Sequence, residues 1–180
     1  MQVHNTALPG VLVLEPRTFQ DERGTFSETW SARTFATATG RQVQFVQDNH
    51  SASSPWVVRG LHYQIQSAQG KLVRVSAGAI YDVAVDLRRG SPNFGRWVAQ
   101  ELSTINGLQL WIPAGFAHGY MSLAKGATVQ YKATDFYAPN HERTLLWNDP
   151  TIAITWPHNA PTLSSKDEQG LPLEQADVYE

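Results

Sequence analysis

Polar side chains gather in four segments of this chain, and some of them could move protons. The segments are residues 21–28, 47–64, 113–119 and 131–143. Within the second segment, His62 is a candidate base, because imidazole has an ordinary pKa of about 6.5. A single histidine is more often a packed or surface residue, so its type and position alone leave both interpretations open.

Two tyrosines could supply an acid and a flat binding surface. Tyr131 and Tyr137 are six residues apart in a run of even alternation, which predicts that they share one face of a single strand. They would then be either core aromatics or an acid and a stacking surface at the mouth of a barrel. A phenol, with an ordinary pKa near 10, carries its proton at neutral pH and can donate it.

Three basic residues could serve an anionic ligand. Lys71 opens a mostly apolar, strand-like run, where an inward ammonium would need an anionic partner and an outward one would be ordinary. Arg23 and Arg59 each precede a glycine, which lets backbone and guanidinium approach a phosphate closely. Solvated surface arginines fit the same pattern.

A metal centre is the other chemistry that His62 suggests, because barrels of the cupin type commonly bind iron, manganese or zinc. Such sites need a His-x-His pair, a carboxylate a few residues on and a later His. Here Gln64 and Gly60 occupy the positions two residues from His62, and His118 has too few partners. We therefore expect neither metal ligands nor a cofactor.

The elements that must position these residues are predicted to be short strands. Alternation of period two is clearest at residues 80–88 and recurs at 71–75, 97–102, 108–112 and 128–136. Turn signals separate these runs at 76–78, 89–93, 105–107 and 124–126. Many short strands at close spacing favour a sandwich or barrel, so the predicted fold class is all-β, a jelly-roll β-barrel.

Helical signal is thin, and we expect one or two short peripheral helices. Ser31 is a predicted cap for a helix over residues 31–39 that stops before Gly40, and a second helix is expected to begin near Ser164 or Ser165. No repeat or linker interrupts the 180 residues, which predicts a single domain over 1–180.

Composition excludes several classes of protein. Hydrophobic residues make up 42% and charged residues 17%, as in globular proteins. A net charge of −2 argues against nucleic-acid binding, and the absence of cysteine excludes disulfides and thiolate chemistry. With no apolar run of about 18 residues and no signal-peptide pattern at the N-terminus, we expect a cytoplasmic protein without a membrane partner.

Six ordered motifs resemble the dTDP-4-dehydrorhamnose 3,5-epimerase family over nearly the whole chain. They are Asp-Glu-Arg-Gly-x-Phe at 21–26, Gln-Asp-Asn at 47–49, Arg-Gly-Leu-His-Tyr-Gln at 59–64, Pro-x-Gly-Phe-Ala-His-Gly at 113–119, Tyr-Lys-x-Thr-Asp-x-Tyr-Ala-Pro with His-Glu-Arg at 131–143, and Leu-Ser-x-Lys-Asp at 163–167. The resemblance implies a cupin-type jelly roll, a homodimer, no metal, and a dTDP-4-keto-6-deoxyhexose as the small-molecule substrate.

The resemblance also implies catalytic roles. His62 would remove protons from carbons 3 and 5, with Asp167 holding the other ring nitrogen. Lys71 would stabilise the enolate oxyanion, and Tyr131 would return a proton on the opposite face.

Ten further residues are implied to bind the substrate: Arg23, Phe26, Glu28, Gln47, Asn49, Arg59, His118, Tyr137, Glu142 and Lys166. The arginines would hold the diphosphate, Tyr137 would stack on thymine, and His118 would contact the sugar. Arg23, Phe26 and Glu28 would serve the neighbouring subunit's site.

Three rival functions remain at this point. A mono-epimerase acting on carbon 3 or carbon 5 of a related sugar would share the same His, Lys and Tyr. A metal-dependent cupin oxygenase or isomerase is disfavoured by the poor ligand set, and a non-catalytic sugar-nucleotide binder by the complete acid–base set.

Overall fold

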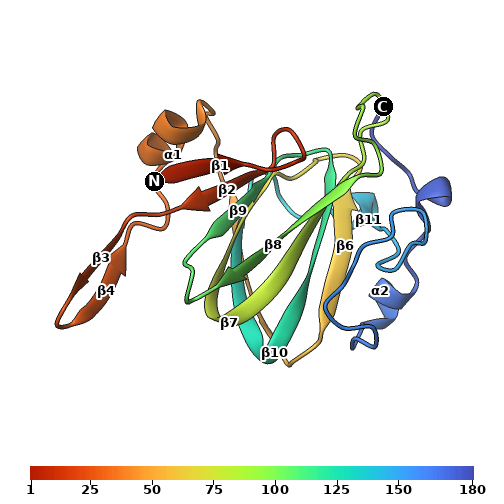
Figure 1. Ribbon diagram of the computed structural model, residues 1–180. Helices are drawn as coiled ribbons and strands as arrows, with labels where there is room; N and C mark the ends of the chain where they lie inside the picture. The colour runs from red at the N-terminus through yellow and green to blue at the C-terminus, as the bar shows by residue number, and fades with distance from the viewer.

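The strands of the computed structural model, which describes residues 1–180, form one large antiparallel sheet that curls on itself and a separate hairpin (Figure 1). The large sheet runs β1-β2-β9-β7-β10-β6-β11, with β5 added beside β10 and β8 beside β7. Its strands are β1 (Gln2–Asn5), β2 (Leu12–Glu15), β5 (Gln47–Ser53), β6 (Val58–Gln64), β7 (Lys71–Asp86), β8 (Trp97–Ser103), β9 (Gln109–Ile112), β10 (Phe116–Ala133) and β11 (Glu142–Thr144). The hairpin joins β3 (Thr18–Asp21) to β4 (Gly24–Ser27). This arrangement confirms the all-β, jelly-roll prediction.

The two longest strands, β7 and β10, each run through two parts of the barrel and pair with a different strand in each part. The first part of β7 pairs with β9 and its second part with β8. Likewise, β10 pairs with β6 near its start and with β5 near its end. Because β7 and β10 also pair with each other, they form the spine that joins the two halves.

The predicted turns at 76–78 and 124–126 are wrong as chain reversals, because β7 and β10 continue through them. Instead, Gly78 and Gly126 bend the paired strands at one level, both with φ of +72°. A Cβ on Gly78 would lie 2.0 Å from the carbonyl oxygen of Gly126, so the two backbones meet where no side chain fits. The signal for a turn therefore marks a bend that two strands share.

The prediction that Tyr131 and Tyr137 share a strand is also wrong. Strand β10 ends at Ala133, and Tyr137 lies in the following loop. The backbone leaves the sheet because Thr134 pairs with Gly70 through both its amide and its hydroxyl. Tyr131 therefore lies on a strand of the sheet, whereas Tyr137 lies in a loop that backbone pairing in the sheet does not hold in place.

Both predicted helices are confirmed. Helix α1 (Ala32–Thr39) is capped by the Ser31 hydroxyl and ends at Gly40 in the left-handed conformation. Its buried Phe35 packs against Trp111 and Leu72 on the outside of the barrel. Helix α2 (Ser165–Glu168) begins after Ser164, whose side chain accepts a hydrogen bond from the amide of Asp167.

Short 3₁₀ turns complete the chain at η1 (Pro139–His141) and η2 (Leu173–Gln175). No helix is both long and apolar enough to cross a membrane.

The barrel interior is apolar at one end and polar at the other. Val73, Val75, Ile80 and Val129 belong to a buried cluster of 14 residues that fills the interior. Side chains two residues apart on a strand share a face, so Lys71 and Tyr131 continue the same inward rows toward the end of the barrel. The polar groups therefore stand on rigid strands above a packed apolar floor.

Candidate active site

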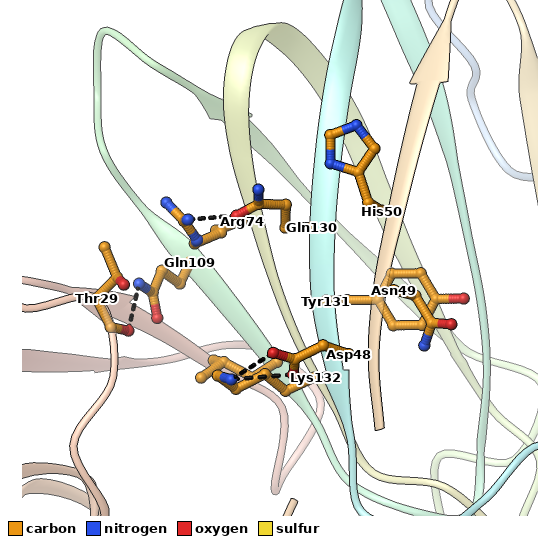
Figure 2. A pocket seen from close by; sticks show the side chains of 10 residues that line it. Thr29, Asp48, Asn49, His50, Arg74, Gln109, Gln130, Tyr131 and Lys132 are labelled. Atoms are coloured by element: carbon orange, nitrogen blue, oxygen red, sulfur yellow. Dashed lines mark hydrogen bonds and ion pairs between the residues drawn. The ribbon is translucent and has the colours of Figure 1, made fainter. Parts of the chain in front are cut away.

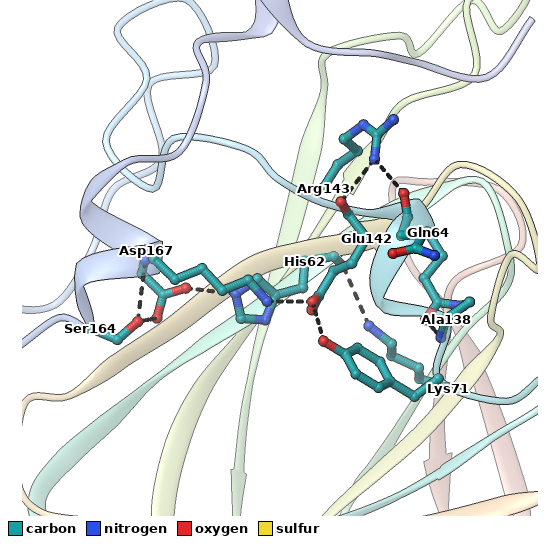
Figure 3. A network of polar contacts seen from close by, with 11 residues as sticks. His62, Gln64, Lys71, Ala138, Glu142, Arg143, Ser164 and Asp167 are labelled. Carbon is teal, nitrogen blue, oxygen red and sulfur yellow. Dashed lines mark hydrogen bonds and ion pairs between the residues drawn. The ribbon is translucent and has the colours of Figure 1, made fainter.

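His62 and Asp167 form an ion-pair-like contact at the polar end of the barrel. Nε2 of His62, on β6, lies 2.6 Å from Oδ1 of Asp167, on α2 (Figure 3). The other carboxylate oxygen of Asp167 accepts a hydrogen bond of 2.9 Å from the Ser164 hydroxyl. Burial acts to raise the pKa of Asp167, but the hydrogen bond and charge of His62, with help from Ser164 and Lys166, hold it below its ordinary value.

The charge on Asp167 fixes the tautomer of His62. An ionised carboxylate can only accept hydrogen bonds, so Nε2 carries the proton and Nδ1 keeps the lone pair. The imidazole is 28% exposed, whereas the Asp167 carboxylate is 5% exposed. The dyad thus presents a partly accessible base supported by a buried anion.

Lys71 is buried beside this dyad. Its Nζ donates a hydrogen bond of 3.3 Å to the backbone carbonyl of His62. Burial lowers the pKa of Lys71 to about 8, against the opposing charges of Glu142 and Asp82. An inward ammonium in this position is available to an oxyanion, which resolves the alternatives that strand parity left open.

His62, Lys71 and Tyr131 line one cavity of about 310 Å³. Burial raises the pKa of the Tyr131 phenol, so it stays protonated over the whole neutral range. Seven of the fourteen predicted site residues line this cavity: Gln47, Asn49, His62, Lys71, Tyr131, Tyr137 and Glu142. A candidate base, a cation and an acid therefore surround one space large enough for a sugar.

Glu142 links two predicted nucleotide contacts at the edge of the cavity. One of its oxygens accepts a hydrogen bond of 2.6 Å from the Tyr137 hydroxyl. The same oxygen forms an ion pair of 2.5 Å with Nζ of Lys166. Burial acts to raise the pKa of Glu142, but these two partners hold it below its ordinary value. Lys166 lines an adjoining cavity of about 420 Å³ that shares Glu142 with the first.

Gln64 fixes the loop that carries Tyr137. Its buried amide donates to the carbonyls of Ser67 and Phe136. Its side-chain oxygen accepts from the amide of Ala138 (Figure 3). Gln47 adds a hydrogen bond of 2.9 Å from the Tyr137 amide to its side-chain oxygen. No role for Gln64 was predicted, although its place two residues after His62 puts it on the same inward face.

The comparisons with known proteins agree on one family. A sequence model described as dTDP-4-dehydrorhamnose 3,5-epimerase matches residues 5–175. The Pseudomonas aeruginosa dTDP-4-dehydrorhamnose 3,5-epimerase is 55% identical over 180 residues, which cover 99% of each chain. The chain belongs to the dTDP-4-dehydrorhamnose 3,5-epimerase family.

Solved structures of related epimerases have the same fold. The dTDP-6-deoxy-D-glucose-3,5-epimerase of Legionella pneumophila, in complex with dTDP-4-keto-L-rhamnose, has a TM-score of 0.95 and 46% identity, covering 98% of this chain and 94% of its own. A 3′-monoepimerase from Streptomyces bikiniensis, in complex with dTDP-quinovose, has a TM-score of 0.89 and 33% identity, covering 95% of this chain and 87% of its own. The cupin-like fold is thus shared by enzymes with different outcomes.

Asp82 is a buried partner of the predicted site residue His118 that sequence reasoning missed, and neither side chain lines the cavity. Its Oδ1 lies 2.6 Å from Nε2 of His118, and both side chains are buried. His118, on β10, is the register partner of His62 on β6. The predicted contact of His118 with the sugar would therefore involve a ring that a carboxylate already orients, as Asp167 orients His62.

Arg23, Phe26 and Glu28 do not reach the epimerase-family cavity of their own chain. They lie on or beside the β3–β4 hairpin, which projects away from the barrel (Figure 1). Phe26 is 71% exposed, and Arg23 pairs only with its neighbour Asp21. Glu28 accepts a hydrogen bond of 2.7 Å from Thr34. Within one chain, none of these three predicted binding residues lines the cavity.

Arg59 lies near the cavity without lining it. Its guanidinium donates a hydrogen bond of 3.0 Å to the Ser53 hydroxyl and one of 3.3 Å to the carbonyl of Ala52, and both acceptors lie on β5. Its positive charge acts against the burial that raises the pKa of Tyr131. These contacts hold a cation beside the phenol.

A second cavity, of about 280 Å³, lies on the outer face of the same sheet (Figure 2). The Arg74 guanidinium donates a hydrogen bond to the side-chain oxygen of Gln130 there, and Lys132 forms an ion pair of 2.9 Å with Asp48. Gln109 donates to the carbonyl of Thr29, but its own buried side-chain oxygen has no partner. No three His, Asp or Glu side chains converge in a way that could hold a metal ion here or elsewhere in the structure.

Proposed function

We propose that this protein epimerises carbons 3 and 5 of dTDP-4-dehydro-6-deoxy-D-glucose to give dTDP-4-dehydro-L-rhamnose. The observation that carries the proposal is the single cavity that His62, Lys71 and Tyr131 line together. Family membership and 55% identity to a named 3,5-epimerase over the full length support the substrate and the reaction.

The chemistry follows from the ketone at carbon 4 of the substrate. The hydrogens on carbons 3 and 5 are acidic, because either carbanion delocalises onto the ketone oxygen as an enolate. Epimerisation requires a base on one face of the sugar, stabilisation of the oxyanion, and a proton donor on the other face. The overall change is a relocation of protons, so the reaction consumes no oxidant and needs no cofactor.

His62 is the proposed base, acting through Nδ1. Asp167 holds Nε2 and would stabilise the imidazolium that forms when the ring accepts a proton. Because Asp167 is buried and also held by Ser164, the ring has little freedom to turn away from the cavity. A base that is held in a fixed orientation toward the substrate lowers the barrier to proton transfer.

Lys71 is the proposed oxyanion partner, and Tyr131 the proposed acid. The ammonium of Lys71 is buried, where a charge interacts with the developing enolate more strongly than it would in water. The phenol of Tyr131 is protonated and stands on a different strand from His62, so the two groups can approach a bound sugar from different sides, and inversion at carbon requires opposite faces. His118, backed by Asp82, would hydrogen-bond the sugar.

The remaining predicted contacts would bind the nucleotide. Tyr137 is 53% exposed, and its ring is the proposed stacking surface for thymine, a type of contact worth roughly 1–3 kcal/mol. Lys166, which pairs with the cavity residue Glu142, and Arg59, whose charge acts on Tyr131, are proposed to bind phosphate oxygens. Gln47, Asn49 and Glu142 are proposed to bond the nucleotide or sugar hydroxyls.

A homodimer would complete this site. Arg23, Phe26 and Glu28 stand on or beside a hairpin whose paired aromatic side chains, Phe19 and Phe26, are 50% and 71% exposed. In a two-fold dimer, the hairpin of each subunit would reach the nucleotide end of the other subunit's cavity.

Solvent deuterium tests the reaction. The 4-keto sugar nucleotide is incubated with the protein in heavy water, and the product is examined by NMR. We expect deuterium at carbons 3 and 5 and the L-sugar as product. No exchange at any carbon would contradict catalysis altogether.

The second candidate is a mono-epimerase, favoured by the likeness to the Streptomyces bikiniensis 3′-monoepimerase at 33% identity. Its signature in the same experiment is deuterium at one carbon only. The higher identities of 55% and 46% to 3,5-epimerases favour exchange at both.

A further inference from the structure

Ser164 makes two hydrogen bonds with the residue that supports the proposed base. Its hydroxyl donates to Oδ2 of Asp167 at 2.9 Å, and its Oγ accepts from the amide of Asp167 at 3.2 Å. Oδ1 of Asp167 is thereby left facing Nε2 of His62 at 2.6 Å. Three side chains in series thus run from the start of α2 into the cavity (Figure 3).

We infer that Ser164 is a positioning residue for catalysis, which orients the Asp167 carboxylate and moderates the basicity that it gives to His62. This inference rests on the proposed function and extends it to a residue that does not touch the substrate. Ser164 would matter only as a helix cap if the hydroxyl did not also occupy the second carboxylate oxygen.

The orienting part of the role follows from burial. Asp167 is 3% exposed, so water does not replace a missing donor on its Oδ2 freely. A carboxylate with one oxygen held by Ser164 and the other by His62 has its side-chain torsions fixed from both ends. Without the hydroxyl, Oδ2 would be an unpaired buried acceptor, and the carboxylate would turn to share its charge differently.

The effect on basicity has a definite sign. A donor on Oδ2 withdraws negative charge from the carboxylate, which weakens its pull on the imidazolium. Without the hydroxyl, the full negative charge of the Asp167 carboxylate acts on His62, so the protonated ring becomes more stable. The base would then be blocked by a proton at a higher pH than in the natural protein.

Other charged groups face the same ring and must be held constant. Glu142 on β11 and Lys71 on β7 lie on the cavity side, Lys166 belongs to α2, and His118 is the register partner on β10. None of them contacts Ser164 by a hydrogen bond or ion pair. Substitution at Ser164 therefore changes the field at His62 chiefly through Asp167.

Two substitutions separate the cap from the hydroxyl on the carboxylate. Glycine is nearly as good as serine at a helix N-cap, whereas alanine is much poorer. Both remove the hydrogen bond to Oδ2. Ser164→Thr keeps a hydroxyl, and Ser165→Ala changes the neighbouring serine, whose side chain makes no hydrogen bond.

The experiment measures kcat/KM for epimerisation against pH in these four variants and in the natural protein. We expect the acid limb to move up by roughly half a pH unit in both Ser164→Gly and Ser164→Ala, and to stay in place in Ser164→Thr and Ser165→Ala. An acid limb that stays or moves down in the glycine variant would overturn the inference, whatever happens to the rate.

The glycine variant carries the test even if the alanine variant does not fold. The natural protein distinguishes this inference from the proposed function: absence of epimerisation there overturns the function, whereas an unmoved limb in active variants overturns only the role of Ser164.

Discussion

Nε2 of His62 lies 2.6 Å from Oδ1 of Asp167, although 105 residues separate the two in the sequence. The contact joins a barrel strand to a four-residue helix near the C-terminus. Since the anion takes Nε2, the lone pair on Nδ1 is the part of the ring left for proton abstraction. The proposed mechanism depends on this pairing more than on any other contact.

The pKa of Lys71 sets the first prediction, a loss of activity in mild alkali. Burial lowers that pKa to about 8, so the ammonium that is proposed to stabilise the enolate is lost as pH rises through that value. We expect kcat/KM to fall about tenfold for each pH unit above the basic limb near pH 8. A profile that stays flat to pH 10 would contradict the oxyanion role of Lys71.

Lys71→Met separates this catalytic role from stability. In the natural protein, the pKa of Lys71 is lower in the folded state than the ordinary 10.5, so the buried ammonium lowers the free energy of unfolding below about pH 8. This destabilisation disappears as the pH rises from 8 to 10.5. We expect the variant to be inactive yet more stable at pH 7 by about 1–3 kcal/mol in urea unfolding. The exposed Lys125→Met is the control and should change neither property.

Tyr131→Phe tests the acid. The phenol is protonated because burial raises its pKa, and its loss removes the donor on one face while leaving His62 in place. We expect product formation to fall by roughly 10²–10⁴-fold, with a smaller loss of solvent exchange into recovered substrate. Equal losses of both would count against Tyr131 as the proton donor.

Gln64→Leu tests how the nucleotide end is held. The substitution keeps the volume but removes two hydrogen bonds to the loop around Tyr137 and a third to the carbonyl of Ser67. We expect dTDP to bind about tenfold more weakly, measured by calorimetry, because the stacking ring is no longer held in place. Gln100→Leu, on the edge strand β8 and outside the cavity, is the control.

The effect of Gln64 should act through Tyr137. In a Tyr137→Ala background, we expect Gln64→Leu to cost little further affinity, because the ring that it positions is gone. Additive losses would mean that Gln64 contributes to binding independently of that loop.

A shared site predicts complementation between inactive subunits. Arg23→Ala removes a residue from the hairpin, and His62→Ala removes the base from the cavity. If the hairpin serves the neighbouring subunit, mixed dimers contain one site with neither change, and an equal mixture should recover about a quarter of the natural activity. No recovery after subunit exchange would contradict a site built from two chains.

The general fold and much of the site could be predicted from local sequence signals. Period-two alternation gave β8 and β9 nearly to the residue, and Ser31 and Gly40 marked both ends of α1. The motif around His62 indicated the proposed base, although only the fold could bring it to Asp167.

Other features depend on tertiary contacts that no local pattern encodes. Alternation put Asp82 on the polar face of its strand, but that face is the barrel interior, where His118 partners it. Gly78 looked like a turn because its need for positive φ is local, whereas its close approach to Gly126 is not. Tyr137 left the predicted strand because Thr134 bonds to Gly70, 64 residues earlier.

The most direct test of the account is solvent exchange by His62→Ala. In heavy water, with the 4-keto sugar nucleotide saturating, the variant should incorporate no deuterium at carbon 3 or carbon 5, while dTDP affinity stays within about twofold of the natural value. His4→Ala, on the exposed strand β1, should exchange normally. Deuterium at either carbon at the natural rate in the His62 variant would contradict the assignment of the base and the mechanism built on it.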